Sequence, residues 1–182
     1  KKKGKSVRLV VPNAHANAQR EKDKIQAMYK FGYEHGLERR ELIFTSLHDV
    51  PNYEQGVPNR TVRELFLLGN LFIFPSVSEN CPLVLLEAMA GKNLLVLNKN
   101  FPPMKDFGQE NALYFEFGSL INTPNYGDGI DKYMQDIATL ILSEFEQNKS
   151  LKAQTRLRKD FNIDSIFKRQ LEPAILEIYA NQ

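Results

Sequence analysis

Residues 72–91, FIFPSVSENCPLVLLEAMAG, decide the fold that the sequence predicts. A short apolar run ends at Pro75, a polar segment covers residues 76–80, and a second apolar run begins at Pro82. A brief apolar run bounded by proline is typical of a strand, and a longer apolar run that ends at glycine is typical of a helix. The stretch therefore predicts a strand, then a tight turn that carries Glu79, then a helix that carries Glu87.

The same alternation of strand-like and helix-like segments continues along the whole chain. Strands are expected at residues 7–11, 41–47, 71–74, 94–97 and 112–115. Helices are expected between and after them, the first with an apolar stripe at Ile25, Met28, Tyr29 and Phe31 and a stop at Gly36. Strands that alternate with helices form parallel sheets through right-handed crossovers. We therefore expect an α/β fold, a Rossmann-like doubly wound parallel sheet with helices on both faces, as one domain over residues 1–182.

The overall composition is ordinary for an α/β domain of this length. The chain has 182 residues, of which 42% are hydrophobic, and this is enough to bury a core. Its net charge of +2 is too small to indicate nucleic acid as a partner. The basic run at residues 1–5, KKKGK, is most simply a solvated end, with a phosphate-binding or membrane-surface patch as the alternative.

Cysteine content and hydropathy bear on the cellular compartment. Cys81 is the only cysteine, so an internal disulfide is excluded and a reducing compartment is expected. The longest apolar stretch, residues 65–74, is far shorter than the roughly 18 residues of a membrane-spanning helix. The sequence starts without a methionine and almost directly in a strand. We therefore expect a domain excised from a longer cytoplasmic protein, one that acts in solution or as a peripheral protein at the inner face of a membrane.

Ligands of open α/β sheets bind in the crevice beyond the carboxyl ends of the strands. The segments that leave the predicted strand ends are residues 12–17, 47–52, 75–80, 98–104 and 116–121. Binding residues are therefore expected in these segments and at the start of the helix that follows residues 75–80.

The two acids of the opening stretch are the first candidates. Glu87 lies about one turn into a helix that is apolar nearly all round, which predicts a buried carboxylate that needs a partner. The partner is either the ribose diol of a nucleotide or a buried lysine, arginine or backbone amide, and spacing alone favours neither. Glu79, in the turn, either contacts sugar hydroxyls or faces the dipole of the helix N-terminus in water.

The start of this helix is a predicted anion site, because its first amides have no partner within the helix. Pro82 lacks an N–H and suits the first helical position, so Leu83 and Val84 are the expected donors. Cys81 has no histidine near it in the sequence to act as the base of a catalytic thiol. The three histidines of the chain are scattered and lack metal-ligand spacing.

These residues together match the pattern of a known family. Residues 75–90, PSVSENCPLVLLEAMA, resemble the signature of the family-four retaining glycosyltransferases with the two-lobed B-type fold (glycosyl transferases group 1). That pattern is Pro-Ser, two residues, Glu, seven residues, then Glu-Ala-Met-Ala, and its acids fall here on Glu79 and Glu87. The downstream segments PPMKDFGQENALYF and RKDFNIDSIFKRQL also look like the family, so the resemblance covers roughly residues 41–171.

The resemblance implies a hexosyltransferase-type enzyme of carbohydrate biosynthesis. Such an enzyme moves a sugar from a nucleotide-diphosphate-sugar donor to an acceptor with retention at the anomeric carbon. This chain would be its C-terminal, donor-binding lobe, in which Glu87 holds the ribose hydroxyls and Glu79 contacts the donor sugar at the catalytic centre. The resemblance implies that the reaction needs no metal ion and no other cofactor.

The remaining donor contacts implied by the resemblance come from two backbone segments. One segment would face the sugar and the diphosphate with Asn80, Cys81, Leu83 and Val84. The other would border the base with Thr45, Ser46 and Leu47. The family has a glycine and an aromatic residue where this chain has residues 80–82, NCP, so the sugar contact is expected to differ.

Two parts of the family's site are expected to lie outside this sequence. The acceptor, a sugar, a lipid or a protein, would bind an N-terminal lobe, and the family's arginine and lysine for the diphosphate lie upstream of the first strand. Lys99 and Lys105, beyond the fourth strand, are the substitutes that the sequence offers. We therefore expect this chain to bind a nucleotide weakly and not to catalyse sugar transfer by itself.

Two other functions remain open. A lobe of a nucleotide-sugar epimerase has the same architecture, but it needs further acid and base residues in the cleft between lobes, and the sequence identifies none. A non-catalytic Rossmann-like binding module is the second alternative, and it leaves Glu79 and Glu87 without a role.

Overall fold

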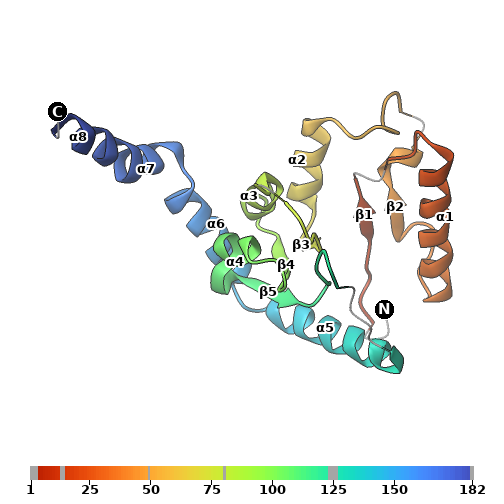
Figure 1. Cartoon of the computed structure of the whole chain (residues 1–182). Helices are drawn as coiled ribbons and strands as arrows, with labels where there is room; N and C mark the ends of the chain where they lie inside the picture. Colours follow the sequence, from red (N-terminus) through yellow and green to blue (C-terminus); the bar gives the residue numbers. More distant parts are fainter. Residues whose placement is uncertain (1–3, 13–14, 49, 80, 123–126, 181–182) are drawn as a thin grey trace. The chain divides into compact units, whose positions relative to one another are not determined.

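The computed structural model shows an α/β protein with parallel strands in two small sheets (Figure 1). The chain divides into two compact units, Lys1–Glu64 and Leu65–Gln182, and the division falls within α2 (Asn59–Leu68). The predicted class and the parallel strands are confirmed, whereas one domain over the whole chain stays a prediction. The structure describes residues 4–12, 15–48, 50–79, 81–122 and 127–180.

The first unit contains one strand–helix–strand motif. β1 (Leu9–Val11) and β2 (Leu42–Phe44) pair in parallel, and α1 (Gln19–Glu34) connects them. The buried hydrophobic side chains of this unit are Ala16, Ile25, Leu42 and Phe44. Gly36 follows the helix as predicted, at φ +83°, a conformation that costs glycine little and other residues more.

Three sequence predictions for this unit are wrong in detail. The strand predicted over residues 7–11 begins only at Leu9. The strand predicted over residues 41–47 ends at Phe44, because the chain turns at once into a 3₁₀ turn, η1 (Thr45–Leu47). The Oγ1 hydroxyl of Thr45 stabilises that turn by donating to the carbonyl oxygen of Pro12 at 2.8 Å. Met28 and Phe31 are 51% and 61% exposed, so the buried stripe of α1 is narrower than its apolar pattern suggests.

The second unit contains a three-stranded parallel sheet in the order β3-β4-β5. Its strands are β3 (Leu71–Phe74), β4 (Leu94–Asn98) and β5 (Ala112–Phe115). The first connection is α3 (Leu83–Ala90), and the second is α4 (Pro103–Gly108) followed by the 3₁₀ turn η2 (Gln109–Asn111). The strands predicted at residues 71–74 and 112–115 are confirmed to the residue, and β4 runs one residue further than predicted.

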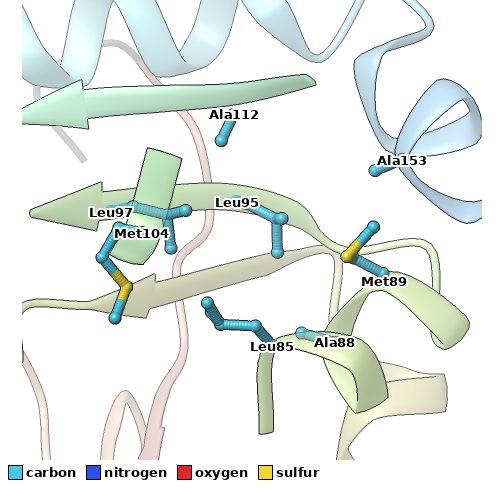
Figure 2. Packing of buried hydrophobic residues seen from close by; sticks show 8 residues of the cluster. All are labelled: Leu85, Ala88, Met89, Leu95, Leu97, Met104, Ala112 and Ala153. Atoms are coloured by element: carbon cyan, nitrogen blue, oxygen red, sulfur yellow. The ribbon is translucent and has the colours of Figure 1, made fainter. Parts of the chain in front are cut away.

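Helices cover both faces of this sheet, because the side chains of β4 alternate between two cores. Leu95 and Leu97 lie in the core that contains Leu85 and Met89 of α3 (Figure 2). Leu94 and Val96 lie in the other core, against α5 (Ile130–Glu144). A strand buried on both faces reads as a continuous apolar run, which is how residues 94–97 appear in the sequence.

The C-terminal segment is helical and begins with α6 (Lys149–Asp160), which packs against α3 and α4 of the second unit. Arg156 fixes this contact by donating from Nη2 to the carbonyl oxygen of Asp106 at 2.9 Å and from Nη1 to that of Phe107. Beyond it lie α7 (Ile163–Ile166), a π-helical turn η4 (Phe167–Leu171) and α8 (Glu172–Ala180). Pro173 lies in the first turn of α8, directly after the π-helical turn, where its missing N–H removes one helical hydrogen bond. No helix in the described part of the chain has the length and apolar character needed to cross a membrane.

The turn between α3 and β4 shows why glycine follows the helix. A Cβ atom on Gly91 would lie 2.5 Å from the carbonyl oxygen of Phe66 and 2.7 Å from Nδ2 of Asn93. Gly91 has a φ of −73°, so its small size is needed here and its conformational freedom is not. The buried Asn93 side chain donates to the carbonyl oxygens of Phe66 (2.8 Å) and Ala88 (3.2 Å), which joins the ends of α2 and α3.

Tyr114, on β5, should make the second unit sensitive to alkaline pH. Its hydroxyl donates to the carbonyl oxygen of Gln109 at 2.9 Å, and burial raises the pKa of Tyr114 to about 12. A raised pKa means that the folded state keeps its proton when the unfolded chain, with a pKa of about 10, has lost it. The stabilisation is therefore complete below about pH 10 and is lost between about pH 10 and pH 12. Titration by tyrosinate absorbance should show one late-titrating tyrosine, which disappears in Tyr114→Phe. A difference between the wild-type and Tyr114→Phe curves that has its midpoint near pH 10 would contradict this prediction.

Candidate functional site

Asn98, the last residue of β4, organises the carboxyl edge of the three-stranded sheet. Its side chain is fully buried. Nδ2 donates to the carbonyl oxygens of Ser76 (3.1 Å) and Gly118 (2.8 Å). Oδ1 accepts from the backbone amides of Asn100 (3.1 Å) and Phe117 (3.3 Å). This one side chain therefore joins the three segments that leave β3, β4 and β5, where the sequence predicted binding residues.

Sequence reasoning missed Asn98 as a site-forming residue, although a signal was present. The residue closes the apolar run LLVLN, in which every residue is buried. A polar side chain at the end of a fully buried strand needs hydrogen-bond partners, and here these come from neighbouring loops. The sequence does not say which loops they are, because the partners Ser76 and Gly118 lie 22 and 20 residues away.

The loop between β3 and α3 presents Glu79 to solvent. The Oγ hydroxyl of Ser76 lies 3.3 Å from Oε1 of Glu79 and 3.1 Å from the carbonyl oxygen of Ser78, so its proton is shared between two acceptors. Glu79 and Cys81 are both exposed, and Cys81 is a free thiol. Asn80 lies outside the described residues. The carboxylate of Glu79 is thus positioned by its own loop and open to a ligand.

Glu87 is exposed, which contradicts the predicted burial of its carboxylate. The helix α3 buries Leu85, Ala88 and Met89 against the sheet, while Leu83, four residues before Glu87, is 62% exposed. An all-apolar helix usually implies burial on every side, but α3 is covered on one side only. Glu87 therefore needs no buried partner and is accessible to a ligand from solvent.

The start of α3 also differs from the prediction. Pro82 is the N-cap and not the first helical residue, since its ψ of 71° is not helical. The amide of Leu83, predicted to bind an anion, already donates to the carbonyl oxygen of Cys81 at 2.8 Å. Val84 is half-buried in the first turn, and its amide remains the predicted donor.

The two lysines predicted to bind the diphosphate have different surroundings. Nζ of Lys99 lies 3.1 Å from Oε2 of Glu116, and Nδ2 of Asn100 donates to Oε1 of the same carboxylate at 3.2 Å. Hydrogen bonds from Lys99 and Asn100 lower the pKa of Glu116, so this carboxylate stays ionised. Lys99 is therefore already paired with an anion. Lys105 is exposed on α4.

The predicted base-binding residues lie in the first unit, in η1. Thr45 and Ser46 are buried, and Leu47 is 42% exposed. Thr45 is committed to its bond with Pro12, whereas no described residue hydrogen-bonds to the buried Oγ of Ser46. Of the three predicted residues, Leu47 is the one whose side chain can contact a ligand directly. Glu79, Glu87, Lys99 and Lys105 belong to the second unit.

Neither a metal-binding group nor a related protein assigns a function to this site. Within the residues that the structure describes, histidine, cysteine and acidic side chains form no group of three or more that could hold a metal ion. No protein-family model, no curated protein and no solved structure matches this chain. The function is therefore inferred from the residues and their geometry.

Proposed function

We propose that this chain is the donor-binding part of a retaining glycosyltransferase with the two-lobed B-type fold. The observation that carries the proposal is the strand–loop–helix unit of β3 and α3, in which the signature acids Glu79 and Glu87 are both exposed. Loop acids beyond the carboxyl end of a parallel strand suit a ligand rich in hydroxyl groups. The proposal includes a Rossmann-like doubly wound fold for the chain as a whole.

In this proposal the nucleotide-diphosphate-sugar lies along the loop and the first turns of α3. Glu87 accepts hydrogen bonds from the two ribose hydroxyls, because adjacent hydroxyls match the two oxygens of a carboxylate. Glu79 contacts the donor sugar, and the backbone of Cys81, Leu83 and Val84 faces the sugar and the diphosphate. The base contact implied for Thr45, Ser46 and Leu47 belongs to the first unit and stays a prediction. The reaction transfers the sugar to a sugar, lipid or protein acceptor with retention, in the cytoplasm or at the inner face of a membrane.

The paired state of Lys99 is compatible with a role at the diphosphate. An exposed ion pair such as that between Lys99 and Glu116 contributes little to stability, because solvent screens the two charges. A diphosphate carries more negative charge than one carboxylate, so it can compete for the ammonium group. Lys105, which is exposed on α4, is the second candidate for a contact with the diphosphate.

Calorimetric titration with UDP, GDP and ADP tests the proposal. We expect one of the three to bind at millimolar concentration or below. Glu87→Gln should weaken that binding at least tenfold, because hydrogen bonds to a charged acceptor contribute about 1.5–3 kcal/mol. The matched control is Glu177→Gln on α8, which removes the same charge from an exposed helical position and should leave the affinity unchanged.

Two outcomes of this titration count against the proposal. If none of the three nucleotides binds at millimolar concentration, a non-catalytic binding module becomes the better assignment. If a nucleotide binds equally well to Glu87→Gln and to the wild type, the ribose role of Glu87 is wrong.

A further inference from the structure

A pocket of about 350 Å³ lies between α1 and β2 in the first unit. Tyr29 and Tyr33 contribute from α1, and Leu42 and Phe44 contribute from β2. Arg39, before β2, and His48, after it, are also part of the lining. The volume lies at the lower end of the range of about 300–1,000 Å³ that is usual for small-molecule sites. Apart from Leu47, no residue of the proposed donor site lines this pocket.

The strand β2 offers backbone groups to this pocket. It pairs with β1 on one side, and no second strand joins it in the described part of the chain (Figure 1). The amide of Leu9 donates to the carbonyl oxygen of Glu41 at 2.7 Å, which fixes the side of β2 that faces β1. Because backbone groups alternate in direction along a parallel strand, those of Leu42 and Phe44 point away from β1. The backbone groups of Leu42 and Phe44 are therefore not used in pairing with β1.

The tyrosines of α1, whose rings stack on each other, give the pocket an aromatic wall. The rings of Tyr29 and Tyr33 are 5.7 Å apart between centroids, with an interplanar angle of 26°. Tyr29 is held in place by an edge-on contact with Phe44, whose ring centroid is 5.1 Å away. Tyr33 is 45% exposed, so part of this wall is open. Offset stacking against such a wall favours a planar ring.

Arg39 supplies a positive charge that the described residues do not neutralise. No carboxylate among them forms an ion pair with Arg39, whereas Nε of its neighbour Arg40 lies 3.0 Å from Oε2 of Glu38. A guanidinium group binds carboxylates and phosphates through paired hydrogen bonds. An arginine beside an aromatic wall therefore favours a ligand that combines a ring with an anionic group.

We propose that this pocket binds a small planar aromatic molecule that carries an anionic substituent, with the ring against Tyr29 and Tyr33 and the anion on Arg39. This site is independent of Glu79 and Glu87, so it stands whether or not the chain is part of a glycosyltransferase. The ligand class is aromatic acids of one or two rings, which the volume of the pocket accommodates.

Titration of the isotope-labelled full chain, followed by backbone amide resonances, tests this site with two probes. The probes are 2-naphthoate and its uncharged counterpart 2-naphthamide, which have the same ring. We expect both probes to shift the amide resonances of residues 42–44. Naphthoate should bind about tenfold more tightly than naphthamide, because only naphthoate forms a charge-assisted hydrogen bond with Arg39. Equal affinities, or shifts absent from residues 42–44, would overturn the proposal.

Two variants and two controls locate the recognition. Arg39→Gln should reduce the affinity for naphthoate to that for naphthamide, and Tyr33→Leu should weaken both probes. Arg40→Gln, which removes the same charge from the next residue, should behave as the wild type. Glu87→Gln should also leave naphthoate binding unchanged, which separates this site from the proposed donor site. Equal losses in Arg39→Gln and Arg40→Gln would show a general charge effect and would refute the assignment of Arg39.

Discussion

Replacing Asn98 with alanine should lower the free energy of unfolding by about 4 kcal/mol, because the four hydrogen bonds of its side chain contribute about 1 kcal/mol each. The substitution also leaves the backbone groups of three loops without their partner in a buried place. A loss of this size is a large part of the roughly 5–15 kcal/mol that stabilises a typical domain. Chemical denaturation followed by circular dichroism would measure it.

Two companion variants show whether the hydrogen bonds of Asn98 are responsible. Asn100→Ala removes an exposed side chain from the next turn and should cost less than about 1 kcal/mol. Asn98→Asp keeps the acceptor oxygen for Asn100 and Phe117 but points a second oxygen at the carbonyls of Ser76 and Gly118.

The aspartate variant should therefore show a pH dependence that the alanine variant lacks. A buried carboxylate that faces carbonyl oxygens has a raised pKa in the folded state. Its stability deficit should therefore be largest at neutral pH and should shrink as the pH falls toward about 4, where the protonated group can donate one hydrogen bond. Equal stability of Asn98→Ala and wild type would show that the hydrogen bonds of Asn98 do not hold the three loops together.

Substitution of Gly91 by alanine should cost about 3 kcal/mol, at the upper end of the range for overpacking a close contact. The added methyl carbon would lie 2.5 Å from the carbonyl oxygen of Phe66 and 2.9 Å from its carbonyl carbon, and backbone atoms cannot rotate away. The same methyl group would displace the Asn93 side chain from its two acceptors. Thermal unfolding of wild type and variant at equal protein concentration would measure the loss.

Gly129→Ala is the matched control for Gly91→Ala. Gly129 has a φ of −84°, close to that of Gly91, and a Cβ there would meet no atom within 4 Å. The substitution should change the stability by less than about 1 kcal/mol, since alanine adopts this conformation without strain. If both alanine variants lose stability to the same extent, the steric explanation for Gly91 is wrong and the cause is a general loss of glycine flexibility.

The local pattern of the sequence predicted the second unit well. Its strands are short apolar runs bounded by proline, glycine or asparagine, and such runs determine β3, β4 and β5 within one residue. The same proline and glycine positions predicted that Glu79 lies in the loop and that Glu87 lies on the helix. Local pattern and local structure agree here because each strand is a short apolar run with clear ends, and such a run needs no partner-specific information.

The errors concern properties that depend on what lies around an element. The composition of α3 predicted a buried Glu87, but a helix is buried only where another element covers it, and α3 is covered on one side. The prediction that Met28 and Phe31 are buried was wrong for the same reason. Thr45 ended β2 early through a bond to Pro12, a residue 33 positions away that no local window contains.

The buried amide of Asn98 also has a consequence for motion. The segments after β3, β4 and β5 share one set of hydrogen bonds, so a fluctuation that frees one segment removes bonds from the other two. Local opening of such a region is a cooperative event with a single free energy, and the three segments do not fray independently. A molecule that binds to any one of them in its closed arrangement would thereby order all three, and contacts at one strand end would be felt at the others.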